Sequence, residues 1–174
     1  MEKRLQNLIG ILDKRKLDAF LITDRNNIRY LTGFRGEDCA LVISKNQNFI
    51  ITDFRFLEEV NSSGIIKKYF HVELRKKLFS DSVKQIYKRL KFKTLAFESK
   101  RLPYKSYVEL KRLLSGVMLI AEEALLEKLR LVKDAAEIES IKKAISISKS
   151  AYKEISEHIM PGLTESYLAA RLDY

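Results

Sequence analysis

The side chains best suited to metal binding or nucleophilic catalysis are few and far apart in this sequence. Its 174 residues contain two histidines, His71 and His158, and one cysteine, Cys39. Glu154 precedes His158 by four residues, a spacing that can place two metal ligands on one face of a helix. No further histidine or cysteine completes a site, and a histidine near a helix C-terminus is explained by the helix dipole. We therefore predict no metal ligand and no catalytic residue among these side chains.

Two other kinds of active site are also disfavoured. Cys39 lies within an apolar run, where a free cysteine behaves as a small hydrophobic residue. Residues 33–36 begin and end with glycine but lack the G-x-x-x-x-G-K spacing of a phosphate-binding loop. Because one cysteine cannot form an intrachain disulfide, and no signal-peptide pattern opens the chain, we expect a cytoplasmic protein.

The composition is typical of a globular chain with a basic surface. Hydrophobic residues make up 46%, enough to bury a core, and no apolar run approaches the roughly 20 residues of a membrane-spanning helix. Lys and Arg total 33 against 23 Asp and Glu, an excess that can signal a nucleic-acid partner. The basic runs are scattered over 67–68, 75–77, 88–93 and 142–143. Because scattered charge is typical of a solvated surface, we expect neither nucleic-acid nor membrane binding.

Helices and strands are predicted to alternate up to about residue 120. Apolar residues fall on one face of an N-terminal helix, at Leu5, Leu8, Ile9 and Leu12. We predict strands over 18–23, 39–43, 49–52, 65–72, 94–97 and 117–120, helices over 54–60, 83–90 and 103–114, and a turn at 24–27. Strands 39–43 and 49–52 form a hairpin in this interpretation. The order favours a three-layer α/β domain built on a mixed sheet, covering residues 1–121.

The remaining residues, 122–174, show only helical patterns. The longest helix opens with Asp134 as its N-cap and Glu137 three residues later, which is a capping box, and it stops before residues 161–162, Pro and Gly. Thr164 then caps a last helix, with Glu165 in its first turn.

An apolar stripe runs along the long helix, interrupted only by Ser148. It consists of Ile138, Ile141, Ile145, Tyr152, Ile155 and Ile159. A helix of about 25 residues cannot bury such a stripe against itself. We therefore expect residues 122–174 to open a second domain whose body is not in this sequence. The alternatives are packing on the first domain or on the same helix of a second copy.

Four segments, in this order, resemble one protein family. NIRYLTGF (27–34) and ITDFRFLEEV (51–60) resemble the paired signatures of the creatinase/prolidase N-terminal domain. LRLVKDAAEI (129–138) and IMPGLTE (159–165) resemble the entry into the "pita-bread" metallopeptidase domain of the same family. The resemblance covers essentially the whole chain and implies that the second domain is truncated here.

The resemblance implies an Xaa-Pro aminopeptidase or dipeptidase, which cleaves the bond preceding proline in short peptides. Such enzymes use two divalent metal ions, manganese, cobalt or zinc, held by two Asp, one His and two Glu. All five ligands would lie beyond Tyr174, so the 174-residue chain alone is expected to be inactive. In this family the N-terminal domain supports dimerisation and narrows the mouth of the active site, so we expect a homodimer.

By position, the loop over residues 33–38 is the segment that the resemblance places at such a mouth. Phe34 would pack on an apolar substrate side chain, and Arg35 would pair with a peptide carboxylate. The alternative is that Phe34 belongs to the core and Arg35 is a solvated charge.

A second function remains open on the same resemblance. Some relatives keep the fold without the activity, as the peptidase-like domain of one eukaryotic histone-chaperone subunit does, and bind proteins instead. The sequence beyond Tyr174 would separate the two: an intact set of metal ligands indicates the enzyme, and several substitutions indicate the binding module.

Overall fold

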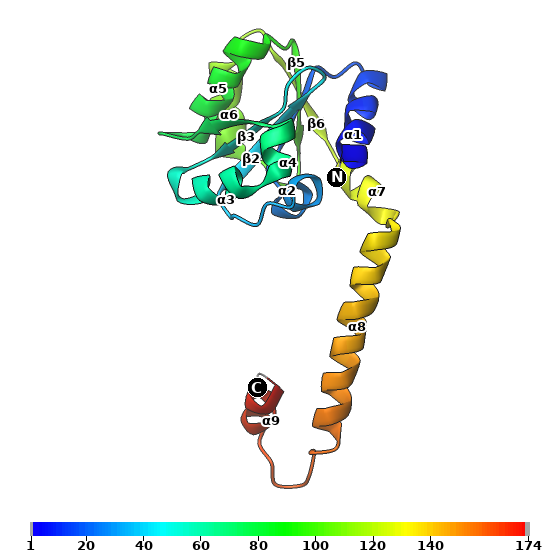
Figure 1. Ribbon diagram of the computed structural model, residues 1–174. Coiled ribbons are helices and arrows are strands. Elements are labelled where there is room, and N and C mark those ends of the chain that lie inside the picture. The colour runs from blue at the N-terminus through cyan, green and yellow to red at the C-terminus, as the bar shows by residue number, and fades with distance from the viewer. Residues whose placement is uncertain (1, 173–174) are drawn as a thin grey trace. The chain divides into compact units, whose positions relative to one another are not determined.

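The computed structural model describes residues 2–172, which form two compact units. The first unit runs to Arg130 and the second begins at Leu131. A six-stranded sheet forms the centre of the first unit (Figure 1). Its spatial order is β4 (His71–Leu74), β3 (Phe49–Thr52), β2 (Cys39–Ser44), β1 (Ala19–Ile22), β5 (Thr94–Glu98) and β6 (Met118–Glu122).

The sheet is mixed, as predicted. β2 runs antiparallel to both of its neighbours, β1 and β3, whereas the pairs β3–β4, β1–β5 and β5–β6 are parallel. Five strands therefore end at the same edge of the sheet, and β2 begins there. β2 and β3 are the hairpin expected from the sequence.

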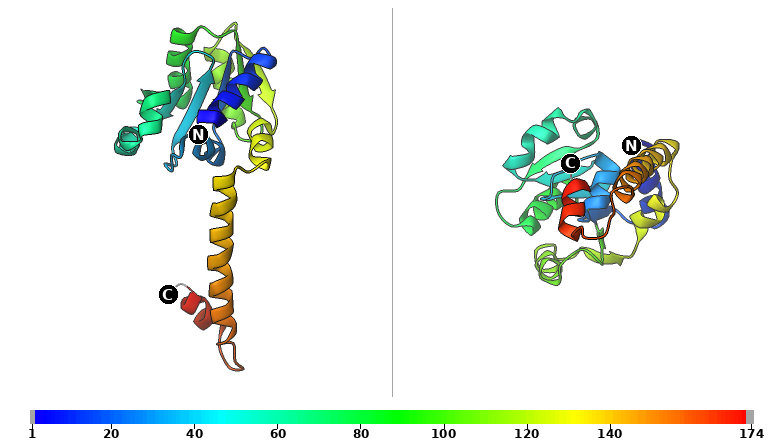
Figure 2. Two further views of the ribbon diagram at one scale, coloured as in Figure 1. Left: turned by 45° about the vertical axis from the view of Figure 1, so that its right-hand side comes forward. Right: turned by 90° about the horizontal axis from the view of Figure 1, so that it is seen from below.

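Helices cover both faces of the sheet, which gives the predicted three layers (Figure 2). The helices of this unit are α1 (Glu2–Lys14), α2 (Arg25–Thr32), α3 (Leu57–Ser62), α4 (Gly64–Tyr69), α5 (Phe79–Leu90), α6 (Tyr104–Leu113) and α7 (Leu125–Leu131), and a short 3₁₀ helix (Phe54–Phe56) precedes α3. α5 and α6 lie on one face, and α1, α2, α3, α4 and α7 lie on the other.

The central strands are buried on both faces, so their side chains alternate between two cores. In β1, Phe20 and Ile22 join the core beneath α1 and α2, whereas Ala19 and Leu21 join the core beneath α5 and α6. This explains why the strand reads as a continuous apolar run rather than as an alternation.

Two local predictions were wrong. Residues 24–27 were predicted to be a turn, but Asp24 is the N-cap of α2 and accepts hydrogen bonds from the backbone N–H groups of Asn26 and Asn27. Residues 65–72 were predicted to be one strand, but the segment is α4 followed by β4. The Ser63 hydroxyl caps α4 at Ile66, whose side chain is buried in the core.

The first compact unit includes α7, which follows the last strand of the sheet. Leu125 and Leu126 of α7 are buried in the same core as α1 and α2. α7 therefore packs with the first unit, which runs to Arg130. The predicted second region also includes residues 173 and 174, which lie outside the described residues.

The second unit consists of α8 (Ala135–Ser156) and α9 (Glu165–Leu172). The capping box at the start of α8 is present: Asp134 and Glu137 each accept a hydrogen bond from the backbone N–H of the other. Along the apolar stripe Ile155 is buried, but Ile141 is 45% and Ile145 48% exposed. No helix within residues 2–172 is long and apolar enough to cross a membrane.

Candidate functional site

The loop over residues 33–38 joins the end of α2 to the start of β2. α2 ends at Gly33, which takes a left-handed conformation with φ of 74° and donates its N–H to the carbonyl of Arg29. A residue with a side chain is disfavoured in that conformation, so glycine suits this position. The next residues leave the helix toward the edge where β1, β3 and β4 end.

The Phe34 side chain fixes the loop by packing into the core. Its side chain is only 2% exposed and meets the ring of Phe56 edge to face, with 5.8 Å between ring centres. Gly36 lies directly against both rings: a β-carbon there would come within 2.4 Å of Cζ of Phe34. Of the two interpretations that the sequence left open for Phe34, the structure therefore shows the core position.

Arg35 has a fixed backbone and an exposed side chain. Its N–H donates to Oε1 of Glu59 at 2.8 Å, and its carbonyl accepts from Nη2 of Arg25 at 3.4 Å. Arg25 also pairs with Glu37 at 2.9 Å. Within residues 2–172 the Arg35 guanidinium has no hydrogen-bond or ion-pair partner, and its side chain faces solvent. The loop thus presents one free positive charge from a held backbone.

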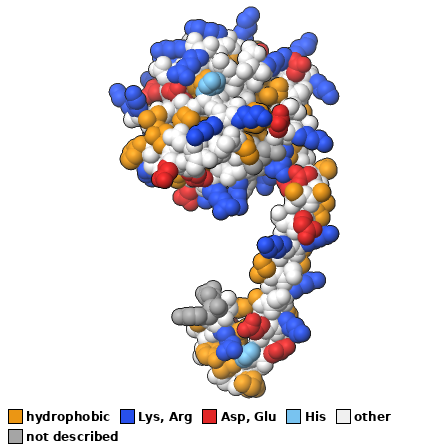
Figure 3. Space-filling model, viewed as in Figure 1, with side chains coloured by type: hydrophobic (Ala, Val, Ile, Leu, Met, Phe, Trp, Pro, Cys, Tyr) orange, Lys and Arg blue, Asp and Glu red, His pale blue; other side chains and the backbone are white. Residues whose placement is uncertain are grey.

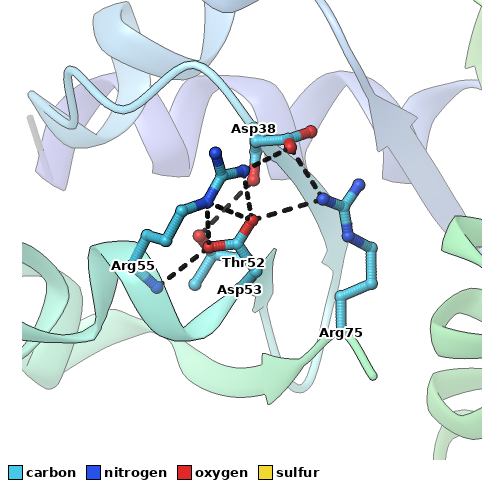
Figure 4. Close-up of polar contacts among 5 residues, drawn as sticks. All are labelled: Asp38, Thr52, Asp53, Arg55 and Arg75. Carbon is cyan, nitrogen blue, oxygen red and sulfur yellow. Dashed lines mark hydrogen bonds and ion pairs between the residues drawn. The ribbon is translucent and has the colours of Figure 1, made fainter. Parts of the chain in front are cut away.

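A network of two carboxylates and two guanidinium groups holds the end of the loop (Figure 4). Arg55 contacts both oxygens of Asp53 through Nε at 3.1 Å, and its Nη2 reaches Oδ2 of Asp38 at 2.8 Å. Arg75 approaches from the other side, with Nη2 at 2.8 Å from Oδ2 of Asp38 and 3.4 Å from Oδ2 of Asp53. These four residues come from the start of β2, the end of β3, the 3₁₀ helix and the end of β4.

The charges in this network lower the pKa of both carboxyl groups. The hydrogen bond from Arg75 lowers the pKa of Asp38, and the hydrogen bonds from Arg55 lower the pKa of Asp53 to about 2. Both groups are therefore ionised at neutral pH, so the network is a charge-balanced support. It offers no proton donor or acceptor for catalysis near pH 7.

A cavity of about 280 Å³ lies beside the network at the same edge of the sheet. Thr23, Cys39, Arg75, Phe79 and Arg101 are among the residues that line it. The guanidinium of Arg101 is paired with Asp24 at 2.5 Å. Burial raises the pKa of the Cys39 thiol to about 12, so it is not a thiolate nucleophile at neutral pH.

Each histidine has its contacts within its own unit. His71 lies exposed in β4 against the ring of Phe49. Nδ1 of His158 lies 2.8 Å from the carbonyl of Glu154, and its Nε2 lies 2.8 Å from Nη2 of Arg171, so it joins the ends of α8 and α9. No group of three or more His, Cys, Asp or Glu side chains within residues 2–172 is placed to hold a metal ion. The described residues therefore do not fit a dimetal centre.

Lysine and arginine side chains are distributed over the whole visible face of the first unit (Figure 3). Several of them are ion-paired, including Arg15 with Glu122 and Lys100 with Glu123, each at 2.5 Å. The excess positive charge therefore does not gather in one continuous patch on this face.

The sequence had indicated only Phe34 and Arg35 in this region. It did not indicate Glu59, Asp38 or Arg75, which fix the loop. Asp53, Arg55 and Glu59 lie within the segment 51–60 that carries the family resemblance, and that segment was the available signal for them.

Several known proteins are similar to this chain over almost its whole length. The chain is 31% identical over 172 residues to the uncharacterised peptidase YqhT of Bacillus subtilis, covering 99% of this chain and 47% of that protein. The structure of an Xaa-Pro dipeptidase from Bacillus anthracis superposes with a TM-score of 0.88 at 30% identity, over 98% of this chain and 47% of the other. An X-Pro aminopeptidase from Thermotoga maritima gives a TM-score of 0.84 at 31% identity, over 98% and 48%.

The chain spans about half the length of these relatives. Residues 4–132, which include the loop, its ionic network and the whole six-stranded sheet, match the Creatinase/Prolidase N-terminal domain. The three-layer fold on a mixed sheet is consistent with this match, which covers most of the chain. The protein therefore belongs to the creatinase/prolidase family and contains its N-terminal domain.

Proposed function

We propose that this chain is the N-terminal part of an Xaa-Pro peptidase and that its loop 33–38 narrows the entrance to the active site. The support is the family membership together with relatives named as Xaa-Pro dipeptidase and aminopeptidase. Hydrolysis would require two divalent metal ions. No cluster within residues 2–172 fits them. In this proposal the metal ligands and the catalytic residues lie in the sequence that follows Tyr174.

One observation carries the role of the loop: its backbone at Arg35 and its last residue, Asp38, are held, whereas the Arg35 side chain is free among the described residues. Glu59 and Arg25 fix the backbone at Arg35, while Asp38 is bound to Arg55 and Arg75. A guanidinium on a fixed backbone loses less conformational freedom when it binds a carboxylate than one on a mobile loop. In this proposal Arg35 pairs with the terminal carboxylate of a short peptide, and Phe34 anchors the loop beneath it.

The first test is activity with and without the sequence that follows Tyr174. The 174-residue chain with added manganese should not hydrolyse Ala-Pro or Leu-Pro substrates, whereas a protein extended in its reading frame should. Cleavage by the 174-residue chain would overturn the assignment of the catalytic residues to the following sequence. An extended protein that lacks several metal ligands and binds a protein partner would favour the non-catalytic alternative.

The second test addresses Arg35 in the extended protein. Arg35→Ala should raise KM for a dipeptide about 10-fold and leave kcat nearly unchanged, because a charge-assisted hydrogen bond to the substrate carboxylate is lost in ground and transition states alike. Arg29→Ala, an exposed arginine on α2, is the matched control and should change neither constant. Equal KM values for Arg35→Ala and Arg29→Ala would contradict the role of Arg35.

We also propose that the extended protein is a cytoplasmic homodimer, as expected from the sequence. Sedimentation of the extended protein tests the oligomeric state directly, and a monomer at micromolar concentration would contradict this part of the proposal.

A further inference from the structure

Asn27 opens the first of the family-like segments, and its side chain is completely buried. Its carboxamide has polar contacts on both sides. Nδ2 donates to Oε1 of Glu98 at 2.7 Å and to Oε1 of Glu127 at 3.2 Å, and Oδ1 accepts from Nη1 of Arg130 at 3.0 Å. One side chain thus contacts α7 twice and the end of β5 once.

Glu98, the partner at the end of β5, is itself buried, and both of its carboxylate oxygens accept hydrogen bonds. Its Oε2 accepts from the backbone N–H groups of Thr23 and Asp24, each at 2.6 Å. These two N–H groups lie between β1 and α2, so Glu98 fixes the start of α2. Burial raises the pKa of Glu98, and the hydrogen bonds from Asn27 and the backbone oppose that rise.

α7 is the last helix of the first unit, and its apolar side is fixed by Leu125 and Leu126 in the core. Its polar contacts with Asn27 come from Glu127 and Arg130, which are three residues apart and therefore share one face of the helix. Asn27 and Arg130 belong to two different family-like segments, 103 residues apart. The contact between them joins those segments in space.

The other end of α2 carries the loop with Arg35. α2 has eight residues and is therefore about 12 Å long. At this end the Thr32 hydroxyl donates to the carbonyl of Ile28 and accepts from the N–H of Phe34. The helix is thus tied to the loop at one end and to β5 and α7 at the other.

We propose that Asn27 is a positioning residue that locks α2 to β5 and α7 and thereby sets the place of Arg35 at the far end of the helix. The consequence for Arg35 rests on the proposed function above, whereas the lock itself does not. Asparagine suits this position because one short side chain must donate toward two carboxylates and accept from a guanidinium. Aspartate places a third carboxylate beside Glu98 and Glu127, and alanine leaves the buried Glu98 without its amide donor.

Hydrogen exchange of the 174-residue chain, followed by mass spectrometry, tests the lock. Asn27→Asp should speed exchange at pH 7 at least 10-fold in residues 125–131 and 28–34 and leave residues 83–90 of α5 unchanged. Asn26→Asp is the matched control: it adds the same charge one residue earlier, at an exposed position, and should leave all three segments unchanged. The double variant Asn27→Asp with Glu98→Gln swaps the amide and the carboxylate between the two positions. It restores an amide facing a carboxylate and should recover at least half of the lost protection.

If Asn27→Asp does not fold, Arg130→Ala tests the same contact from the side of α7. Arg130 is only partly buried, and its removal should speed exchange in residues 125–131 and leave α5 unchanged. The proposal is overturned if folded Asn27→Asp matches Asn26→Asp, if it affects α5 as much as α7, or if Arg130→Ala leaves α7 as protected as before.

The extended protein separates this proposal from the proposed function. If Arg35→Ala raises KM, Asn27→Asp should raise KM in the same direction with kcat nearly unchanged, and the double variant should be no worse than Arg35→Ala alone. An extended protein without peptidase activity would defeat the proposed function and leave the exchange result standing. Unchanged exchange would defeat the lock whatever the activity.

Discussion

Asp38 and Arg75 lie 37 residues apart in the sequence, and their side chains meet at 2.8 Å. The contact joins the last residue of the loop 33–38 to the residue that follows β4. Together with the pairs formed by Asp53 and Arg55, it holds the end of the loop, and the aromatic contact of Phe34 with Phe56 holds its beginning. The loop is therefore fixed independently of any substrate.

The close contact between Gly36 and two aromatic rings predicts a sharp difference between two glycine substitutions. Gly36→Ala should lower the free energy of unfolding by about 1–3 kcal/mol, because the added β-carbon overlaps Phe34 and Phe56. Gly10→Ala is the control: nothing lies within 4 Å of a β-carbon there, and alanine favours the helix by up to about 1 kcal/mol. Urea unfolding measures both. Equal stability of the two variants would contradict the packing described for the loop.

The ion pairs of Asp53 predict an acid-sensitive part of the stability. The pKa of Asp53 in the folded protein is lowered from 3.8 to about 2, so the folded state holds this proton less tightly than the unfolded state. Its stabilising contribution is therefore complete above about pH 4 and is lost as the pH falls through about 2. Urea midpoints measured from pH 7 to pH 2 should fall over this window.

In Asp53→Asn the same midpoints should start lower at pH 7 and fall less between pH 4 and pH 2. The slope that remains comes in part from Asp38, whose pKa is also lowered. A variant with the slope of the unsubstituted protein would show that Asp53 does not contribute.

Cys39 should be a slow thiol in the folded chain. With its pKa raised to about 12, roughly one thiol in ten thousand is ionised at pH 8. Alkylation by iodoacetamide at pH 8 should therefore be at least 100-fold slower in buffer than in guanidinium chloride, as measured by intact mass. Similar rates in the two solvents would mean that the thiol is neither buried nor hard to ionise.

The exposed part of the apolar stripe on α8 should not stabilise this chain. The double variant Ile141→Gln with Ile145→Gln should leave the melting temperature of the first unit and the exchange protection of α8 within error of the original, since both side chains are about half exposed. Ile155→Gln is the contrasting variant and should reduce protection in α8, because Ile155 is buried. If the double variant converts a dimer into a monomer in sedimentation, the stripe packs on a second copy instead.

Local patterns were sufficient for much of the fold. The spacing of Leu5, Leu8 and Leu12 predicted α1, the capping box at Asp134 and Glu137 predicted the start of α8, and the polar break at 44–48 predicted the β2–β3 hairpin. Each of these signals lies within one or two turns of the element it defines, so distant residues do not change it.

The two errors came from patterns that suit more than one structure. Asp24 followed by arginine and two asparagines is typical of a turn, but the same residue types cap a helix, and contacts of Asn27 with β5 and α7 decide between them. The isoleucines at 65 and 66 favour a strand by propensity, yet burial of Ile66 and the Ser63 cap make this segment a helix.

Local patterns did not predict which side chains meet to support the loop. Asp38, Arg55 and Arg75 become neighbours only when the order and direction of three strands are known. For Phe34 the segment allowed both a core and a surface position, and the choice depends on Phe56 and Gly36 closing over its ring.

Within the six-stranded sheet β2 runs opposite to the other five strands, and the loop 33–38 leads directly into it. The position of the loop therefore depends on the register of β2 against β1 and β3. Leu41 and Ile43 of β2 belong to one core, and Ala40 and Val42 belong to the other. A slip of β2 by one residue against β1 and β3 would exchange these sets and carry Asp38 away from Arg75. Substitutions that even out the sizes of these four side chains should therefore produce chains that fold with a misaligned β2 and a displaced Arg35, while their helix content stays normal.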